Sequence, residues 1–186
     1  MKSVGIKYII ALALVIVVVG VFVLMNPHRQ YSTEKFWKKA TLESVQDVPQ
    51  DALKAGNKNG SVLMWAAMGT SDAAIIRALV ARGADVNESD GELAGTPLSA
   101  AAGYGHKPEI IAELVRLGAD VNKTVNNDET PLMIAARFNH DPTIVQALIA
   151  AGAQVDAVSA QGQTALDIAR RNGNKPAVQV LRAAKP

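Results

Sequence analysis

Apolar side chains recur at helical spacing in three segments of the chain, and a glycine follows each segment. Within a segment the apolar residues stand at positions i, i+1, i+4 and i+5, which places them on one side of a helix. Gly83, Gly118 and Gly152 are 35 and 34 residues apart, and each stands where a left-handed residue ends a helix. The pattern predicts three copies of one helix, with these apolar residues: Ile75, Ile76, Leu79 and Val80; Ile110, Ile111, Leu114 and Val115; Ile144, Val145, Leu148 and Ile149.

A shorter helix is predicted before each of these segments. Thr96, Thr130 and Thr164 are 34 residues apart, and their hydroxyl groups can cap a helix N-terminus. Pro97 and Pro131 follow at the first helical position, where a missing N–H is tolerated. Paired alanines keep these helices thin, so that neighbouring helices can approach closely. Further predicted caps are Ser61, Asp72 and Asp141, and Pro142 falls just inside the second helix that Asp141 caps.

A fixed period of about 34 residues indicates a repeat architecture. The recurring T-P-L, A-A and G-A-D-V-N motifs resemble the ankyrin repeat, although the family's histidine after T-P-L is absent. The resemblance implies an all-α solenoid of helix–turn–helix units joined by β-hairpin-like loops. It also implies a protein-binding module rather than an enzyme, similar to bacterial membrane-anchored or periplasmic ankyrin-repeat proteins. The residues that replace the family's histidine are Met64, Ser99, Met133 and Asp167.

The repeat period and the composition of the N-terminus predict eight segments. The repeats are expected at 60–90, 91–125 and 126–159, with a C-terminal capping repeat at 160–186. Before them we expect a short basic tail at 1–7, a transmembrane signal-anchor helix at 8–25, a linker at 26–32 and an N-terminal capping half-repeat at 33–59.

The predicted anchor helix rests on eighteen residues without a charge, Tyr8 to Met25. This length approaches the roughly 20 residues that span a bilayer. It exceeds the apolar core of a cleaved signal peptide, and only Gly20 after Val18 offers a weak cleavage site. Secretion after cleavage remains the alternative. Basic residues flank the run almost equally, but the short tail before a long domain favours a single-pass protein with its repeats on the periplasmic or other extracytoplasmic side.

Residues 32–48 predict two short helices with different apolar faces. Phe36, Trp37 and Ala40 form one face, and Leu42, Val45 and Val48 form the other. Two interpretations compete for the aromatic residues. They could anchor the chain at a membrane interface, or they could cover the end of the first full repeat. We favour the cap, because solenoids need their ends covered.

Charge and composition narrow the functional classes. The net charge is +2, but residues 1–39 hold six basic and one acidic side chain, and the remainder holds thirteen basic and sixteen acidic ones. The repeats are therefore mildly acidic, which argues against a nucleic-acid partner. The chain has no cysteine, and His106 and His140 share one turn position that we interpret as structural. No catalytic motif occurs, so we expect no catalytic residue, metal, cofactor or small-molecule substrate.

Asparagine recurs in the turn that follows each Gly-Ala pair. Asn87 and Asn122 each begin an N-x-S/T sequon, which would matter only in a eukaryotic secretory setting. We interpret them instead as turn residues that recur for backbone reasons.

Positions that differ between repeats are the candidates for partner binding. In similar ankyrin proteins, hairpin tips and exposed sides of first helices line a concave binding surface. Tyr104 and Phe138 occupy equivalent places in adjacent repeats, where they could anchor a partner or pack between repeats. Met64, Trp65 and Met68 are expected to pack rather than to line a ligand pocket. The candidate residues are Glu92, Leu93, Tyr104, Asn127, Glu129, Arg137, Phe138, Gln161 and Gln163, with Glu113, Arg116 and Gln146 expected on the opposite side.

These features predict a non-enzymatic, membrane-anchored module that binds an envelope or secreted protein through its concave face. Two alternatives stay open. The chain could be a structural scaffold subunit of a membrane complex that acts through its anchor helix, or a toxin-neutralising, immunity-like protein.

Overall fold

The computed structural model describes residues 29–31, 33–54, 60–89 and 95–184. The chain divides into one unit of residues 1–30 and a second unit of residues 31–186. The described residues do not include the predicted basic tail, the predicted anchor helix at 8–25, Glu92 or Leu93. Within the described ranges, no helix is long and apolar enough to cross a membrane.

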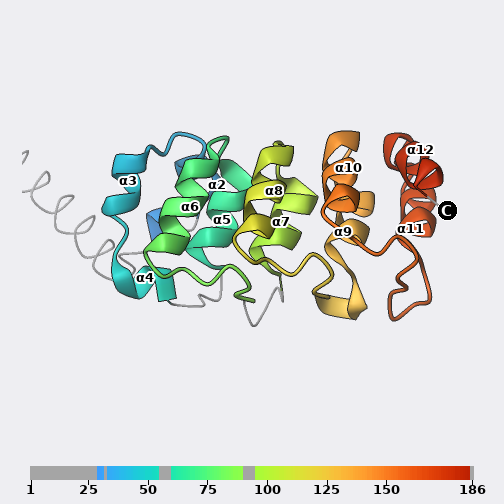
Figure 1. The fold of residues 1–186 in the computed structure, drawn as a ribbon, viewed down its shortest axis with the longest axis horizontal. Coiled ribbons are helices and arrows are strands. Elements are labelled where there is room, and N and C mark those ends of the chain that lie inside the picture. Colours follow the sequence, from blue (N-terminus) through green and yellow to red (C-terminus); the bar gives the residue numbers. More distant parts are fainter. Residues whose placement is uncertain (1–28, 32, 55–59, 90–94, 185–186) are drawn as a thin grey trace, which may run out of the picture. The chain divides into compact units, whose positions relative to one another are not determined.

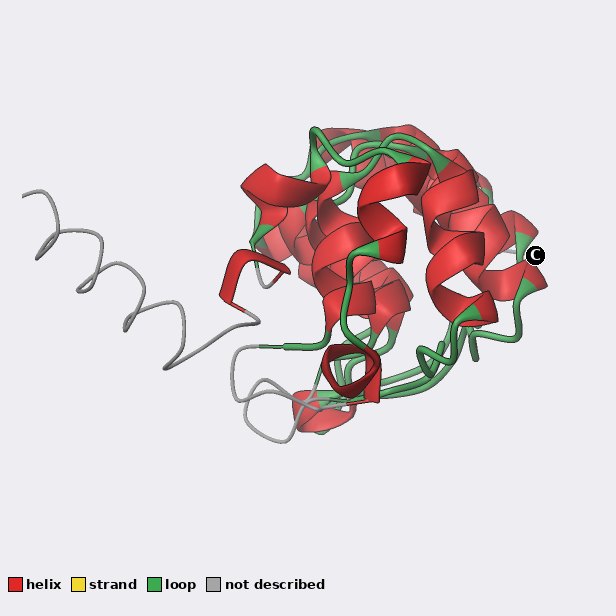
Figure 2. Cartoon of the chain, turned by 90° about the vertical axis from the view of Figure 1, so that its left-hand side faces the viewer, coloured by secondary structure: helices red, strands yellow, loops and turns green. Residues whose placement is uncertain are grey.

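Helix pairs of one arrangement repeat along the described part of the second unit (Figure 1). The first helices stack on one another, and the second helices stack on one another beside them. Figure 2 shows the same pairs along the stack, with helices behind helices and loops behind loops. The first helices are α5 (Val62–Gly69), α7 (Pro97–Tyr104), α9 (Pro131–Phe138) and α11 (Ala165–Arg171), and the second helices are α6 (Ala73–Ala81), α8 (Pro108–Arg116), α10 (Pro142–Ala150) and α12 (Lys175–Ala183).

A shorter pair, α2 (Glu34–Trp37) and α3 (Leu42–Gln46), continues both columns at the N-terminal end. Helix α2 packs against α5, and α3 packs against α6. The Trp37 side chain is buried, and its indole Nε1 donates a hydrogen bond to the carbonyl oxygen of Tyr31 at 2.8 Å. A Cβ atom at Gly69 would lie 2.7 Å from the Glu34 carbonyl oxygen, so only glycine permits this approach. Trp37 therefore covers the first repeat, and the membrane-interface alternative is wrong for this residue.

The second predicted face of this N-terminal segment is correct only in part. Val45 and Val48 are buried as expected, but Leu42 is 49% exposed, so its expected place on the apolar face is wrong. The structure also contains helices that the pattern did not indicate: η1 (Arg29–Tyr31) and α4 (Gln50–Lys54).

The predicted helix boundaries follow from side-chain caps. The hydroxyl of Thr96 accepts a hydrogen bond from the Ser99 N–H at 3.1 Å, and the Ser99 hydroxyl bonds back to the Thr96 N–H. This reciprocal arrangement satisfies two N–H groups that the helix itself leaves open. Thr164 forms the same reciprocal cap with Asp167, whereas Ser61 and Thr130 only accept the N–H of the residue three positions on. Asp72 and Asp141 cap second helices. The prolines at 97, 131 and 142 are first helical residues as predicted, whereas α12 begins at Lys175, one residue before Pro176.

The glycine after each second helix takes the left-handed conformation that the sequence predicts. Gly83, Gly118 and Gly152 have φ angles of 102°, 99° and 95°. At the first of these, the N–H of Ala84 bonds to the Leu79 carbonyl at 3.1 Å, which is the Schellman closure of a helix C-terminus. The chain then turns toward the next repeat.

The loops between repeats differ from the β-hairpins that the resemblance implied. The described residues contain no strand, and the only pairing of that kind among them is one antiparallel bridge between Val125 and Glu129. Asparagine side chains hold the loops instead. Asn122 donates to the Gly152 carbonyl at 3.3 Å and accepts from the Gln154 N–H at 2.9 Å. Asn87 bonds to the following repeat in the same way, so these asparagines have a structural role in the turns through their side chains.

Replacing Asn122 with alanine is expected to lower the free energy of unfolding by about 1 kcal/mol, because two hydrogen bonds between repeats are lost at a partly exposed site. Chemical denaturation of both proteins measures the difference. Gln146→Ala on the exposed side of α10 is the control, and it should change stability by less than about 0.5 kcal/mol. Equal stability of Asn122→Ala and the wild type would show that these bonds do not join the loops.

A second set of asparagines is buried between the helix turns. Asn139 donates to the carbonyl oxygens of Ala102 and Gly105 at 3.0 and 2.9 Å. Asn174 repeats the arrangement one unit later, and it bonds to the carbonyls of Ala136 and Asn139. These amides satisfy carbonyl groups at the ends of first helices, which would be costly to bury without partners.

Glu113 contradicts the expectation that it lies on a solvated outer side. Its side chain is buried, and it bridges Arg77 of α6 at 3.0 Å and Arg116 of its own helix at 2.6 Å. The hydrogen bonds from Arg116 and then Arg77 lower the pKa of Glu113 from 4.5 to about 2. Glu113 therefore joins two repeats electrostatically, and it is unsuited as a neutral surface control.

Glu113→Gln is expected to lower the free energy of unfolding by an amount of order 1 kcal/mol near neutral pH, a figure reduced because both arginine side chains are more than half exposed. The folded-state pKa is the lowered one, so the stabilisation is complete above about pH 4.5 and is lost as the pH falls toward about 2. Denaturant melts of both proteins across this range measure the gap between them. A gap that stays constant would contradict the ion-pair assignment.

Candidate functional site

Two aromatic rings lie side by side at the ends of neighbouring first helices. Tyr104 closes α7 and Phe138 closes α9, and the 34-residue offset places them in equivalent positions. The ring centroids are 5.6 Å apart with 24° between the planes. The side chains remain 50% and 46% exposed. The stacked pair therefore offers a large apolar surface on what we call the first-helix face, formed by the exposed sides of α5, α7, α9 and α11.

An ion pair lies beside the aromatic pair. The guanidinium of Arg137 donates to the Glu129 carboxylate, which is buried, and lies 5.8 Å from the centroid of the Phe138 ring. A guanidinium over a ring face is attracted to it electrostatically. The Nε atom of Arg137 is buried and has no hydrogen-bond partner within the described part of the chain. Glu129 thus helps to hold the Arg137 guanidinium over the Phe138 ring.

Most of the predicted site residues meet in one hollow of about 310 Å³ next to this ion pair, which we call the Arg171 pocket. Its rim combines amides from two loops with charged groups from α9 and α11. Asn127 holds the loops together, because its carbonyl accepts the Ala160 N–H at 2.8 Å. The pocket is lined by Asn127, Glu129, Arg137, Phe138, Gln161, Gln163 and Arg171.

A second hollow, of about 230 Å³, lies on the other side of the aromatic pair and is mainly apolar. We call it the α7 trough. Its floor includes Ala100 of α7, while larger side chains of α5 and α9 form its walls. Met64 is buried as expected, but Trp65 and Met68 are only partly covered and line this trough. The residues that define it are Trp65, Met68, Ala100, Tyr104, Ile134 and Phe138.

The inter-helix turns form a third hollow, of about 460 Å³, that also borders Tyr104 and Phe138. His106 and His140 line it together with Glu34 and Asp141. Within the described residues, no group of three or more histidine, cysteine, aspartate or glutamate side chains is placed to hold a metal ion. The two histidines remain interpreted as turn residues.

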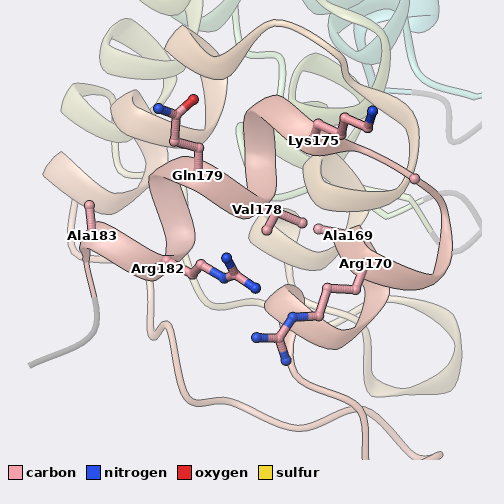
Figure 3. Close-up of a pocket in the computed structure, with 8 residues that line it drawn as sticks. Ala169, Arg170, Lys175, Val178, Gln179, Arg182 and Ala183 are labelled. Atoms are coloured by element: carbon pink, nitrogen blue, oxygen red, sulfur yellow. The ribbon is translucent and has the colours of Figure 1, made fainter.

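A fourth hollow, of about 710 Å³, lies away from the predicted site, at the end of the stack between α11 and α12 (Figure 3). Arg170 stands at the position that the buried Ala136 holds one repeat earlier, and its Nη1 atom is 3.8 Å from the carboxylate of Asp167. Lys175 and Arg182 also border the groove, around Val178. A charged outer surface of this kind is typical of a repeat that caps a solenoid.

The structure thus brings together seven of the nine predicted site residues, around Phe138. Glu92 and Leu93, the other two, lie outside the described residues. Sequence reasoning missed Arg171 and the wall formed by Trp65 and Met68. The signal for the trough was present, because α7 carries Ala100 where α5 carries Trp65 and α9 carries Ile134.

Comparison with known proteins finds a family match for the later repeats. Residues 98–186 match the family model for ankyrin repeats (3 copies). The matched region begins in α7 and includes both aromatic residues and every lining residue of the Arg171 pocket. No curated protein matches the chain. Ankyrin repeats are generally protein–protein interaction modules.

Proposed function

We propose that this chain, which carries ankyrin repeats at residues 98–186, is a non-enzymatic module that binds another protein through its first-helix face. The observation that carries the proposal is the stacked pair of Tyr104 and Phe138. Within the described residues, large hydrophobic side chains are exposed at only four positions, and these two lie in contact with each other. Exposed aromatic clusters on a rigid scaffold commonly supply most of the binding energy of an interface.

The surroundings of the pair support the same proposal. The α7 trough lies on one side and the polar Arg171 pocket on the other, and Phe138 borders both. An apolar centre with a polar and charged rim is the usual arrangement of a protein–protein interface. Because α7 and α9 are anchored by the buried helix stack beneath them, the surface is held in place before a partner arrives.

Site-specific photocross-linking in the cells that produce the protein tests this function. A photoreactive phenylalanine analogue at position 138 is expected to capture a discrete partner. The matched control carries the analogue at position 42, where the wild-type Leu42 is 49% exposed, similar to the 46% of Phe138, but lies in α3. A partner captured equally from both positions, or from position 42 alone, would contradict binding at the first-helix face.

We also propose that the hydrophobic run at 8–25 anchors the protein as a single-pass membrane protein, with the repeats on the periplasmic or other extracytoplasmic side. The support is the sequence: eighteen uncharged residues flanked by lysines and an arginine, with no strong cleavage site. The partner would then be an envelope or secreted protein.

The full-length protein is accordingly expected to stay with membranes through a carbonate wash, which removes proteins held only by surface contacts. N-terminal sequencing of the recovered protein completes the measurement. A soluble product that begins between about residues 21 and 30 would show that the segment is cleaved as a signal peptide.

The scaffold alternative makes a different prediction in a detergent extract of the same cells. If the anchor helix alone supplied the contacts within a membrane complex, a purified chain without residues 1–30, added to that extract, would capture no partner from position 138. Capture by this shortened chain would assign the contacts to the repeats.

A further inference from the structure

The α7 trough exists because α7 carries small side chains between the larger side chains of α5 and α9. At the position where α5 carries Trp65 and α9 carries Ile134, α7 carries Ala100. One turn later α7 carries Gly103, where an added Cβ atom would lie 2.9 Å from the Cγ2 atom of Ile134. The small residues leave a hollow of about 230 Å³ between larger walls. This is below the roughly 300–1,000 Å³ of small-molecule sites, so the trough suits a side chain.

The walls of the trough favour an apolar occupant. Trp65, Met68, Ile134 and Phe138 line it, and none of the described residues that border it is charged. Methionine side chains adapt their shape to irregular apolar partners. A leucine, methionine or isoleucine side chain of a partner would bury its surface here and cover the exposed parts of Trp65 and Met68.

The Arg171 pocket has the opposite character and carries an excess of positive charge. Of its two arginines, Arg137 is paired with the buried Glu129. Arg171 is exposed, and no acidic side chain within residues 95–184 pairs with it. Gln161 and Gln163 add amide groups that can donate hydrogen bonds. Charge complementarity therefore points to a carboxylate on the partner.

Both hollows share Phe138, which separates them on the first-helix face. We propose that they form one composite groove that binds an extended segment of the partner, with an apolar side chain in the α7 trough and an aspartate or glutamate side chain at Arg171. The inference rests on the proposed function and names the chemistry of the partner. The stacked ring of Tyr104 continues the wall between the two subsites.

A random peptide display library, selected against the full chain in detergent, tests the proposal. Selected peptides are expected to share an apolar residue and a nearby aspartate or glutamate. Ala100→Ile should weaken a selected peptide about tenfold or more, because it fills the trough with the side chain that α9 carries at the equivalent position. Arg171→Glu should weaken it about two- to fivefold, with a loss that shrinks as salt is added.

Arg182→Glu is the matched control for charge, because Arg182 is exposed and lines only the end groove in Figure 3. It should change affinity less than twofold. If Ala100→Ile does not fold, as judged by circular dichroism, the Arg171 comparison decides alone. Three results would overturn the composite groove: selected peptides without acidic residues, equal effects of the two charge reversals, or no selected peptide at all. Cross-linking from position 138 alongside any of these results would leave the binding function intact and reject only this inference.

Discussion

Replacing Leu114 with alanine is expected to lower the free energy of unfolding by about 2–5 kcal/mol. Leu114 is fully buried in α8, in the column of second helices between α6 and α10. Its removal leaves a cavity that both neighbouring repeats line, and a stacked array relaxes little around such a gap. Chemical denaturation monitored by helical circular dichroism measures the loss.

The control for Leu114→Ala is Val158→Ala. Val158 is also apolar, but 59% of its surface is exposed in a loop, so its truncation should change stability by less than about 0.5 kcal/mol. A loss below about half a kcal/mol for Leu114→Ala would contradict the repeat register. Equal losses for the two variants would show that burial in the stack does not determine stability.

The double variant Tyr104→Ala/Phe138→Ala is expected to weaken partner binding by at least about 2 kcal/mol, roughly thirtyfold in Kd. The two rings form the exposed apolar centre of the first-helix face. Their removal deletes apolar contact area and leaves water at the centre of the interface. The measurement is calorimetric titration with the partner that cross-linking from position 138 identifies.

Two controls separate binding from folding in that experiment. Leu42→Ala removes a comparably exposed side chain from α3 and should leave the affinity unchanged. The melting temperature of the double variant should stay close to that of the wild type, since both rings are about half exposed. A fall of several degrees would assign the rings to packing between repeats.

The helical frame could be predicted because its determinants are local. Thr96 caps α7 through a residue three positions away, and Gly118 ends α8 through its own backbone conformation. Period and cap together predict the first residue of each helix from α5 to α11. The exception is α12, where Asn174 serves both as helix cap and as the amide that bonds to the preceding repeat. Because one residue performs both roles, α12 begins one residue earlier than the 34-residue offset from α10 predicts.

The residues of the candidate site could be predicted from the sequence better than its shape could. The contact between Tyr104 and Phe138 could be predicted because they hold equivalent positions in adjacent repeats. Residues at equivalent positions lie next to each other when the repeats stack. The burial of Glu113 and the exposure of Leu42 were missed, since both depend on which neighbour covers a given helix face. The trough was missed for a related reason. It depends on small residues in one repeat between large residues in the two adjacent repeats, a pattern visible only across three units.

Hydrogen–deuterium exchange of the full-length protein, with and without its captured partner, tests the central claim most directly. Amide exchange reports local opening and its suppression by contact. The account predicts slower exchange in α7, α9 and the loop that contains Asn127 when the partner is bound, with α8 and α10 little changed. Slower exchange confined to α8 and α10, with none in α7 and α9, would contradict it and place the interface on the second-helix side.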